Sequence, residues 1–197
     1  MRRAPRVSSP IVETVLSYGL AIVAFGVMAA AVLKTLASNL KYIYTRPLLI
    51  NSLRTNANHT EMLCKSSPET YFAAVGEAIK TAAMMRSQDP KILPTATAPA
   101  YDAAGKAVVA KWGALLGKAK IGAMAAGGAL ALPISKSQVP PIPVIVLAVV
   151  VGIGYLWLFL FKGEVERCVI RARAEILPEV DRAFVAGRYV FPPLPPT

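Results

Sequence analysis

Few side chains in this sequence belong to the types that carry out covalent chemistry. The single histidine, His59, lies in the polar run from Asn56 to Thr60, where we expect a surface loop rather than a catalytic base. The two cysteines, Cys64 and Cys168, are far apart and have no metal-ligand spacing. The sequence contains no glycine-rich phosphate loop, nucleophile elbow or recognisable pair of carboxylates. It therefore predicts no enzyme activity and no catalytic, cofactor-binding or metal-binding residue.

One carboxylate, Glu13, precedes a long apolar run. A carboxylate within a membrane is a functional candidate. Glu13 lies so near the start of the run that its side chain can reach the lipid headgroups, and we expect it there.

The elements that position these residues are mainly apolar. The chain has 197 residues, of which 55% are hydrophobic and only 17% charged, and its mean hydropathy is +0.49. These values are typical of a membrane protein. A net charge of +11 would suggest nucleic acid in a soluble protein, but here an excess of Lys and Arg marks cytoplasmic segments and an anionic lipid surface. We expect a lipid bilayer as partner and no nucleic acid.

Two apolar runs are long enough to cross a bilayer. Val15 to Leu33 is about 19 residues long, which fits an uncleaved span better than the short apolar core of a signal peptide. Val144 to Phe161 contains no charged residue and, at about 1.5 Å per residue, nearly crosses a hydrocarbon core of ~30 Å. Both are predicted membrane spans.

The run 121–135 is shorter and rich in Gly and Ala, so its role decides the topology. With three spans, most Lys and Arg share one side, which is then cytoplasmic. With two spans, this run lies in the interface and a basic central segment is exported. We prefer three spans, because the small residues and the Pro-rich turn that follows suit a helical hairpin. Labelling of Cys64 from outside intact cells would contradict this choice.

The polar segments also predict helices. A helix from the first span continues through Tyr44 to Arg46-Pro47, and Tyr42 and Tyr44 suit an interfacial belt. A second helix starts at 66–69, where Ser, Pro and Glu are good first-turn residues, and it packs through Phe72, Val75, Gly76, Ile79 and Ala83. Segment 87–99, with three prolines, is a predicted loop.

Two further helices are predicted beside the second and third spans. One starts near Ala100 and can run straight into the apolar segment at Ile121. The third span emerges as an amphipathic helix, and a short helical piece from Pro178 ends at Gly187.

The predicted fold is thus all-α, a helical integral membrane protein with three transmembrane helices and an amphipathic helical cytoplasmic segment. Its parts are a basic N-terminal segment, 1–10; transmembrane helix 1, 11–37; a helical cytoplasmic segment, 38–118; transmembrane helix 2, 119–135; a Pro-rich hairpin turn, 136–143; transmembrane helix 3, 144–161; a cytoplasmic amphipathic helix, 162–187; and a Pro-rich tail, 188–197.

Small residues at helical spacing predict where helices approach closely. They form one set in each predicted span, namely Gly19, Gly26 and Ala30; Ala119, Ala123, Gly127 and Ala131; and Ala148 and Gly152. We expect these faces to contact other membrane helices.

This layout resembles the MotA/TolQ/ExbB proton-channel superfamily. The stretch RPLLINSLRTNANHTEMLCKSSPETYFAAVGEAIKTA is similar to the segment after the first span in that family, and GKAKIGAMAAGGALAL takes the place of its glycine-rich penultimate span. The resemblance implies a homo-oligomeric ring around a single-span partner in a bacterial inner membrane, with the central segment and the C-terminus cytoplasmic, and proton flow that drives motion.

The family's pore-facing helices carry polar residues that this chain lacks. Val144 to Phe161 has no hydroxyl except that of Tyr155, so no ion-binding residue is transferred from the family. The alternative function is a membrane scaffold or assembly subunit that binds partner helices without transporting an ion.

Overall fold

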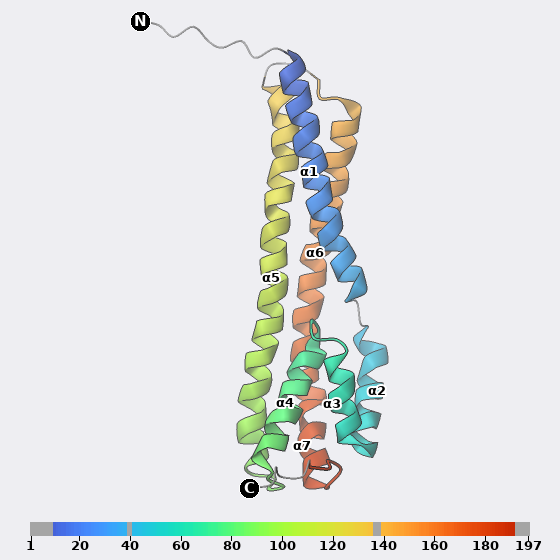
Figure 1. Cartoon of the computed structure of the whole chain (residues 1–197), viewed down its shortest axis with the longest axis vertical. Coiled ribbons are helices and arrows are strands. Elements are labelled where there is room, and N and C mark those ends of the chain that lie inside the picture. The colour runs from blue at the N-terminus through green and yellow to red at the C-terminus, as the bar shows by residue number, and fades with distance from the viewer. Residues whose placement is uncertain (1–9, 39–40, 136–138, 192–197) are drawn as a thin grey trace, which may run out of the picture. The chain divides into compact units, whose positions relative to one another are not determined.

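The computed structural model describes residues 10–38, 41–135 and 139–191, and within these ranges the chain forms α-helices and no strand (Figure 1). The helices are α1 (Pro10–Ala37), α2 (Tyr42–Thr55), α3 (Ala57–Lys65), α4 (Tyr71–Met85), α5 (Leu93–Ile134), α6 (Ile142–Glu175) and α7 (Leu177–Val185). The predicted all-α fold is confirmed. Parts of the predicted basic segment, hairpin turn and Pro-rich tail, at 1–9, 136–138 and 192–197, lie outside the described residues.

Three helices are long and apolar enough to cross a membrane, as the three-span prediction requires. The chain divides into two compact units. The first, which we call the apolar unit, comprises 1–37 and 114–161; the second, the polar unit, comprises 38–113 and 162–197. Helices α5 and α6 are continuous and contribute residues to both units.

The continuity of α5 confirms that the helix near Ala100 runs into the apolar segment, but the predicted loop at 87–99 is too long. Helix α5 begins at Leu93 and includes two of the loop's three prolines. Pro94 lies in its first turn, where a backbone N–H has no acceptor within the helix, so the N–H that proline lacks costs no hydrogen bond. The chain entering α5 is fixed by the backbone oxygen of Asp89, which accepts from the amide of Leu93 at 3.1 Å.

Two other predicted helix boundaries are wrong. Helix α1 ends at Ala37, and a separate helix, α2, begins at Tyr42 and continues past Pro47 to Thr55. Helix α4 begins at Tyr71 rather than at 66–69, because the side chain of Thr70 caps it by accepting from the amide of Phe72 at 3.3 Å.

The polar run around His59 is the start of α3, not a loop. The side chain of Asn56 caps this helix by accepting from the amides of Asn58 and His59 at 3.0 and 3.2 Å. Asn is a favoured N-cap residue because its side chain satisfies amides that lack a helical partner. His59 itself is exposed.

The polar unit has one apolar core, to which α2, α3, α4, α7 and the polar-unit parts of α5 and α6 all contribute. The predicted packing face of α4 is confirmed, since Phe72, Val75 and Ile79 are buried. The short helix predicted from Pro178 is α7, and the chain turns after it at Gly187, whose φ of 67° is a conformation that glycine adopts at little cost.

Candidate functional site

The apolar unit holds the residues that the sequence assigned to helix packing. Its buried positions on α1 alternate in steps of three and four residues, and they are Ser17, Ala21, Ala24, Met28, Ala31 and Thr35. The same alternation occurs on α5 at Ala119, Gly122, Ala126, Ala129 and Pro133. Such a seven-residue repeat keeps one face of each helix toward its neighbours. We call these positions the seam; on α6 the seam includes Val144, Val151 and Leu158.

Small seam residues allow close approach between the helices. A side chain built at Gly122 would lie 3.4 Å from the backbone oxygen of Ala24, so the backbones of α5 and α1 nearly touch there. A side chain built at Gly154 on α6 would lie only 2.6 Å from Cγ of Met28. The space that Gly154 leaves is therefore filled by Met28.

Most of the predicted packing residues lie outside the seam. Ala119 is buried within the chain, and Ala123 and Ala148 are half-buried. The others are exposed, namely Gly19, Gly26, Ala30, Gly127, Ala131 and Gly152. No atom lies within 4 Å of a side chain built at any of the four glycines in that set. That these residues meet helices of another chain stays a prediction.

On α5 the reason for this difference is geometric. Residues four apart on an α-helix are rotated by about 40° from one another, so a row of four such residues turns through roughly 120°. The predicted row from Ala119 to Ala131 therefore leaves the seam after its first members. The seven-residue repeat, with a mean step of 3.5 residues, stays on it.

Two polar side chains are buried in the described part of the apolar unit. Thr35 donates to the backbone oxygen of Val32 at 2.7 Å and accepts from Nε1 of Trp157 at 3.0 Å. The other, Ser17, is 18 positions away on α1, about 27 Å along the axis. Neither Thr35 nor Trp157 was identified from the sequence, and the heptad repeat was the signal that would have marked Thr35 as inward-facing.

Between these two levels the seam of α1 is apolar. Its members there are Ala21, Ala24, Met28 and Ala31. The one hydroxyl on the apolar half of α6, that of Tyr155, is next to Gly154 and so lies at the level of Met28. Ala21 and Ala24 still separate that level from Ser17, so the described interior of one chain offers no continuous polar path for a proton.

An apolar groove of about 420 Å³ runs between α1 and α6 on the surface of this unit. Its lining includes Phe25, Val32 and Leu36 from α1 and Ile153 and Trp157 from α6. Trp157 is its one side chain with a polar atom, and that atom is already bonded to Thr35.

Charged residues mark the two ends of the apolar unit. Glu13 lies in the first turn of α1 and Lys34 in its last turn. Gly122 packs against Ala24 and Val27, so in the antiparallel pair Lys118 and Lys120 lie beside the C-terminal half of α1. Both are exposed. The half of the described unit toward Ala37 thus carries three lysines, and the opposite end a carboxylate.

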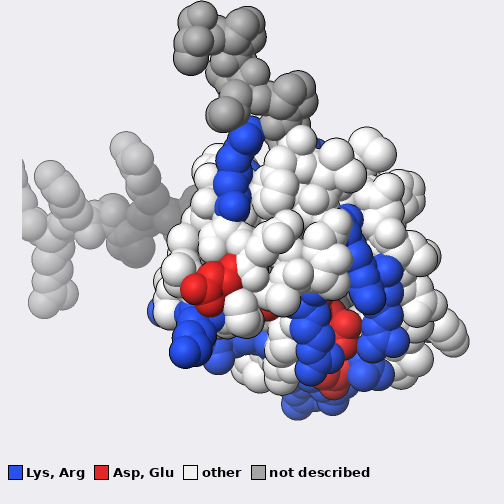
Figure 2. Space-filling view, turned by 90° about the horizontal axis from the view of Figure 1, so that it is seen from below, with Lys and Arg blue, Asp and Glu red and all other residues white. Residues whose placement is uncertain are grey.

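Ion pairs connect side chains beside the apolar core of the polar unit. Glu179 on α7 is buried and accepts from Nε and Nη2 of Arg54 on α2 at 3.3 and 3.2 Å, and from Arg182 at 2.6 Å. These hydrogen bonds lower the pKa of Glu179, and the one from Arg54 has the largest effect. A cleft of about 780 Å³ opens beside this cluster. In the view from below, basic side chains are prominent on this end of the polar unit (Figure 2).

A second set of contacts connects distant segments of the polar unit. Arg173 on α6 forms two hydrogen bonds with Asp102 on α5, at 2.6 and 2.9 Å. Glu175 accepts from the hydroxyl of Tyr42 at 3.0 Å and pairs with Arg46 at 2.5 Å. Tyr42 is therefore a core residue, and its predicted place in an interfacial belt is wrong.

The cysteines and described acidic residues are not arranged for metal binding. No group of three or more His, Cys, Asp or Glu side chains that could hold a metal occurs within 10–38, 41–135 and 139–191. Both cysteines are buried free thiols, and burial raises the pKa of Cys64 to about 12. No protein-family model, curated protein or solved structure matches this chain.

Proposed function

We propose that this protein is an oligomeric membrane subunit that holds a partner membrane helix, and that a single copy conducts no ion. The observation that carries the proposal is the apolar unit itself. Its three helices close around a mainly apolar seam in which Ser17 and Thr35 are the polar members, while the apolar outer faces and the exposed small residues remain available to other helices in the bilayer.

The first candidate is an energy-transducing subunit of the MotA/TolQ/ExbB kind. Two features support it: three helices of spanning length, and the continuation of α5 and α6 as single helices into the polar unit. That is the layout on which the sequence resemblance rests. In this candidate, the polar group that carries protons comes from the partner helix, because the two hydroxyls of the described seam, at Ser17 and Thr35, are about 27 Å apart along α1 with apolar side chains between them.

The second candidate is a scaffold that transports nothing, and the apolar interior favours it. The experiment that separates the two is proton leak into liposomes that contain the protein with whatever membrane partner co-purifies. The mass of the detergent-solubilised complex is measured first, because the channel candidate requires a ring with a single-span partner. Proton leak through such a complex supports the channel; a tight membrane despite correct assembly leaves the scaffold. A monomer without a partner contradicts both.

The orientation that we propose places the polar unit in the cytoplasm of a bacterial cell, with the apolar unit in the inner membrane. The chain passes between the units after Ala37, Gly113 and Phe161, at the end where Lys34, Lys118 and Lys120 lie. An excess of Lys and Arg at one end of the spans favours the cytoplasmic side.

Cys64 is a poor reporter of orientation because it is buried and its thiol resists ionisation. Met62, two residues away on α3, is 63% exposed, so a cysteine introduced there is the better reporter. An impermeant thiol reagent should label the Met62→Cys variant only after the cells are opened, with the parent protein as control. Labelling in intact cells would reverse the orientation.

A further inference from the structure

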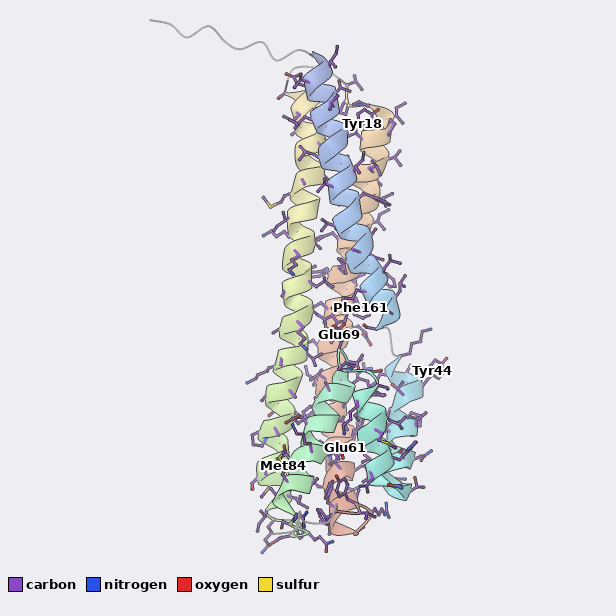
Figure 3. All side chains as sticks on the ribbon, in the orientation of Figure 1. Tyr18, Tyr44, Glu61, Glu69, Met84 and Phe161 are labelled. Carbon is purple, nitrogen blue, oxygen red and sulfur yellow. The ribbon has the colours of Figure 1, made fainter. Side chains whose placement is uncertain are left out.

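An apolar patch lies exposed at the start of α2. It consists of Ile43, Tyr44, Pro47 and Leu48, which we call the α2 patch; Ile43 and Tyr44 are 77% and 71% exposed. Tyr44 projects away from the rest of the polar unit (Figure 3). The opposite face of α2, with Leu49 and Leu53, is buried in the core. The patch is therefore not part of the packing of its own unit.

The apolar character of this face is confined to its first two turns. Further along α2 the same face carries Asn51, Arg54 and Thr55, all exposed. At about 100° per residue these polar side chains lie in line with the patch. This face of α2 is thus apolar at the N-terminal end, which follows α1 in the chain, and polar at the C-terminal end.

The covalent chain keeps the patch near the end of α1. Helix α1 ends at Ala37 and α2 begins at Tyr42. Ile43 is six residues from Ala37, and even a fully extended chain spans at most about 3.6 Å per residue, roughly 20 Å here. Whatever the arrangement of the two units, the patch can reach the bilayer surface at which α1 ends.

We propose that the α2 patch inserts into the headgroup boundary of the leaflet where α1 ends. This inference rests on the proposed function, because it requires that α1 crosses a bilayer. Tyr and aliphatic side chains are suited to the boundary between acyl chains and headgroups. Lys41, exposed one residue before α2, is placed to contact an anionic headgroup. The first turns of α2 then hold the polar unit against the membrane surface.

The test uses the full chain in vesicles of phosphatidylcholine and phosphatidylglycerol. Single cysteines at Tyr44→Cys and Leu48→Cys carry an environment-sensitive fluorophore, and the parent, whose own thiols are buried, controls for background labelling. Met84→Cys is the matched control, because Met84 is also exposed and apolar but lies elsewhere on the polar unit (Figure 3). Val149→Cys, at an exposed position deeper in the third span on α6, reports the span itself.

Nitroxide lipids labelled near the headgroup should quench the fluorophores at 44 and 48 roughly twofold or more strongly than the one at 84, as expected for interfacial insertion. Deep nitroxides should quench the one at 149. If 44 and 48 behave like 84 while 149 is quenched, the inference is wrong and the span stands. If 44 and 48 are shielded from aqueous iodide without lipid quenching, protein covers the patch and the inference is again wrong. If 149 is not quenched, the proposed function fails.

Discussion

Replacement of Gly154 by alanine tests the packing of α1 against α6 in the apolar unit. A Cβ atom at this position would lie 2.6 Å from Cγ and 3.1 Å from Sδ of Met28. Carbon atoms in contact prefer separations of about 3.5–4.0 Å, so one side must move by roughly 1 Å. Met28 is itself buried, so its movement disturbs the seam.

Gly152 provides the matched control. It lies on the same helix, and no atom lies within 4 Å of a side chain built there. Alanine in place of glycine favours a helix by up to about 1 kcal/mol at either position. At Gly154 this gain is opposed by overpacking of about 1–3 kcal/mol. We expect Gly154→Ala to be less stable than Gly152→Ala by about 1–3 kcal/mol, because the propensity term cancels in the comparison.

The measurement is the free energy of unfolding of each variant in detergent micelles, by titration with a denaturing detergent. Equal stabilities for the two variants would refute the reasoning, since Met28 would then not fill the space beside Gly154. A double-mutant cycle with Met28→Ala adds a second check. Truncation of Met28 removes the contacting atoms, so the cost of Gly154→Ala should shrink in that background.

Three other predictions follow from single contacts. Thr35→Val removes the hydrogen bond from Trp157 and should lower the free energy of unfolding by roughly 1 kcal/mol, with a change in tryptophan emission; unchanged stability and emission would contradict the bond. Glu61 accepts from Lys65 and from the hydroxyl of Tyr189, contacts that lower its pKa, so its stabilisation is present above its ordinary pKa of 4.5 and lost as the pH falls below it. Glu61→Gln should reduce the loss of unfolding free energy at acid pH by about 1 kcal/mol. An unchanged pH dependence would show that Glu61 does not contribute to it. A maleimide at neutral pH should modify neither native cysteine and both after denaturation, and rapid native labelling would show that they are accessible.

Local start and stop signals failed where neighbouring elements compete for the same residues. The serines at 66 and 67 are good helix caps, but they follow the end of α3, and Thr70 caps α4 instead. Pro94 marked a loop in the sequence, yet it lies in the first turn of α5, the one part of a helix in which proline costs nothing. Each signal was physically sound, and its position relative to the adjacent helix decided the outcome.

The sequence also did not show which face of each helix packs against the others. Small residues occur on several faces of α1 and α5. On α5 a row with four-residue spacing looked as suitable as the row with seven-residue spacing that the helix uses, whereas on α1 Gly19 and Gly26 have the seven-residue spacing but lie on an exposed face. Only the contact among three helices distinguishes these rows, because a row is buried only where a second helix lies along it.

The sequence by itself determined that this protein is helical and suited to a membrane, because the length and apolar character of a run are properties of the chain alone. The tertiary structure decided the roles of Tyr42 and Tyr44, which no local pattern separates. Tyr42 is 7% exposed and donates to Glu175, 133 residues away, whereas Tyr44 is exposed. The difference arises from a partner that only folding brings near, and it leaves Tyr44 at the surface where we propose that the membrane begins.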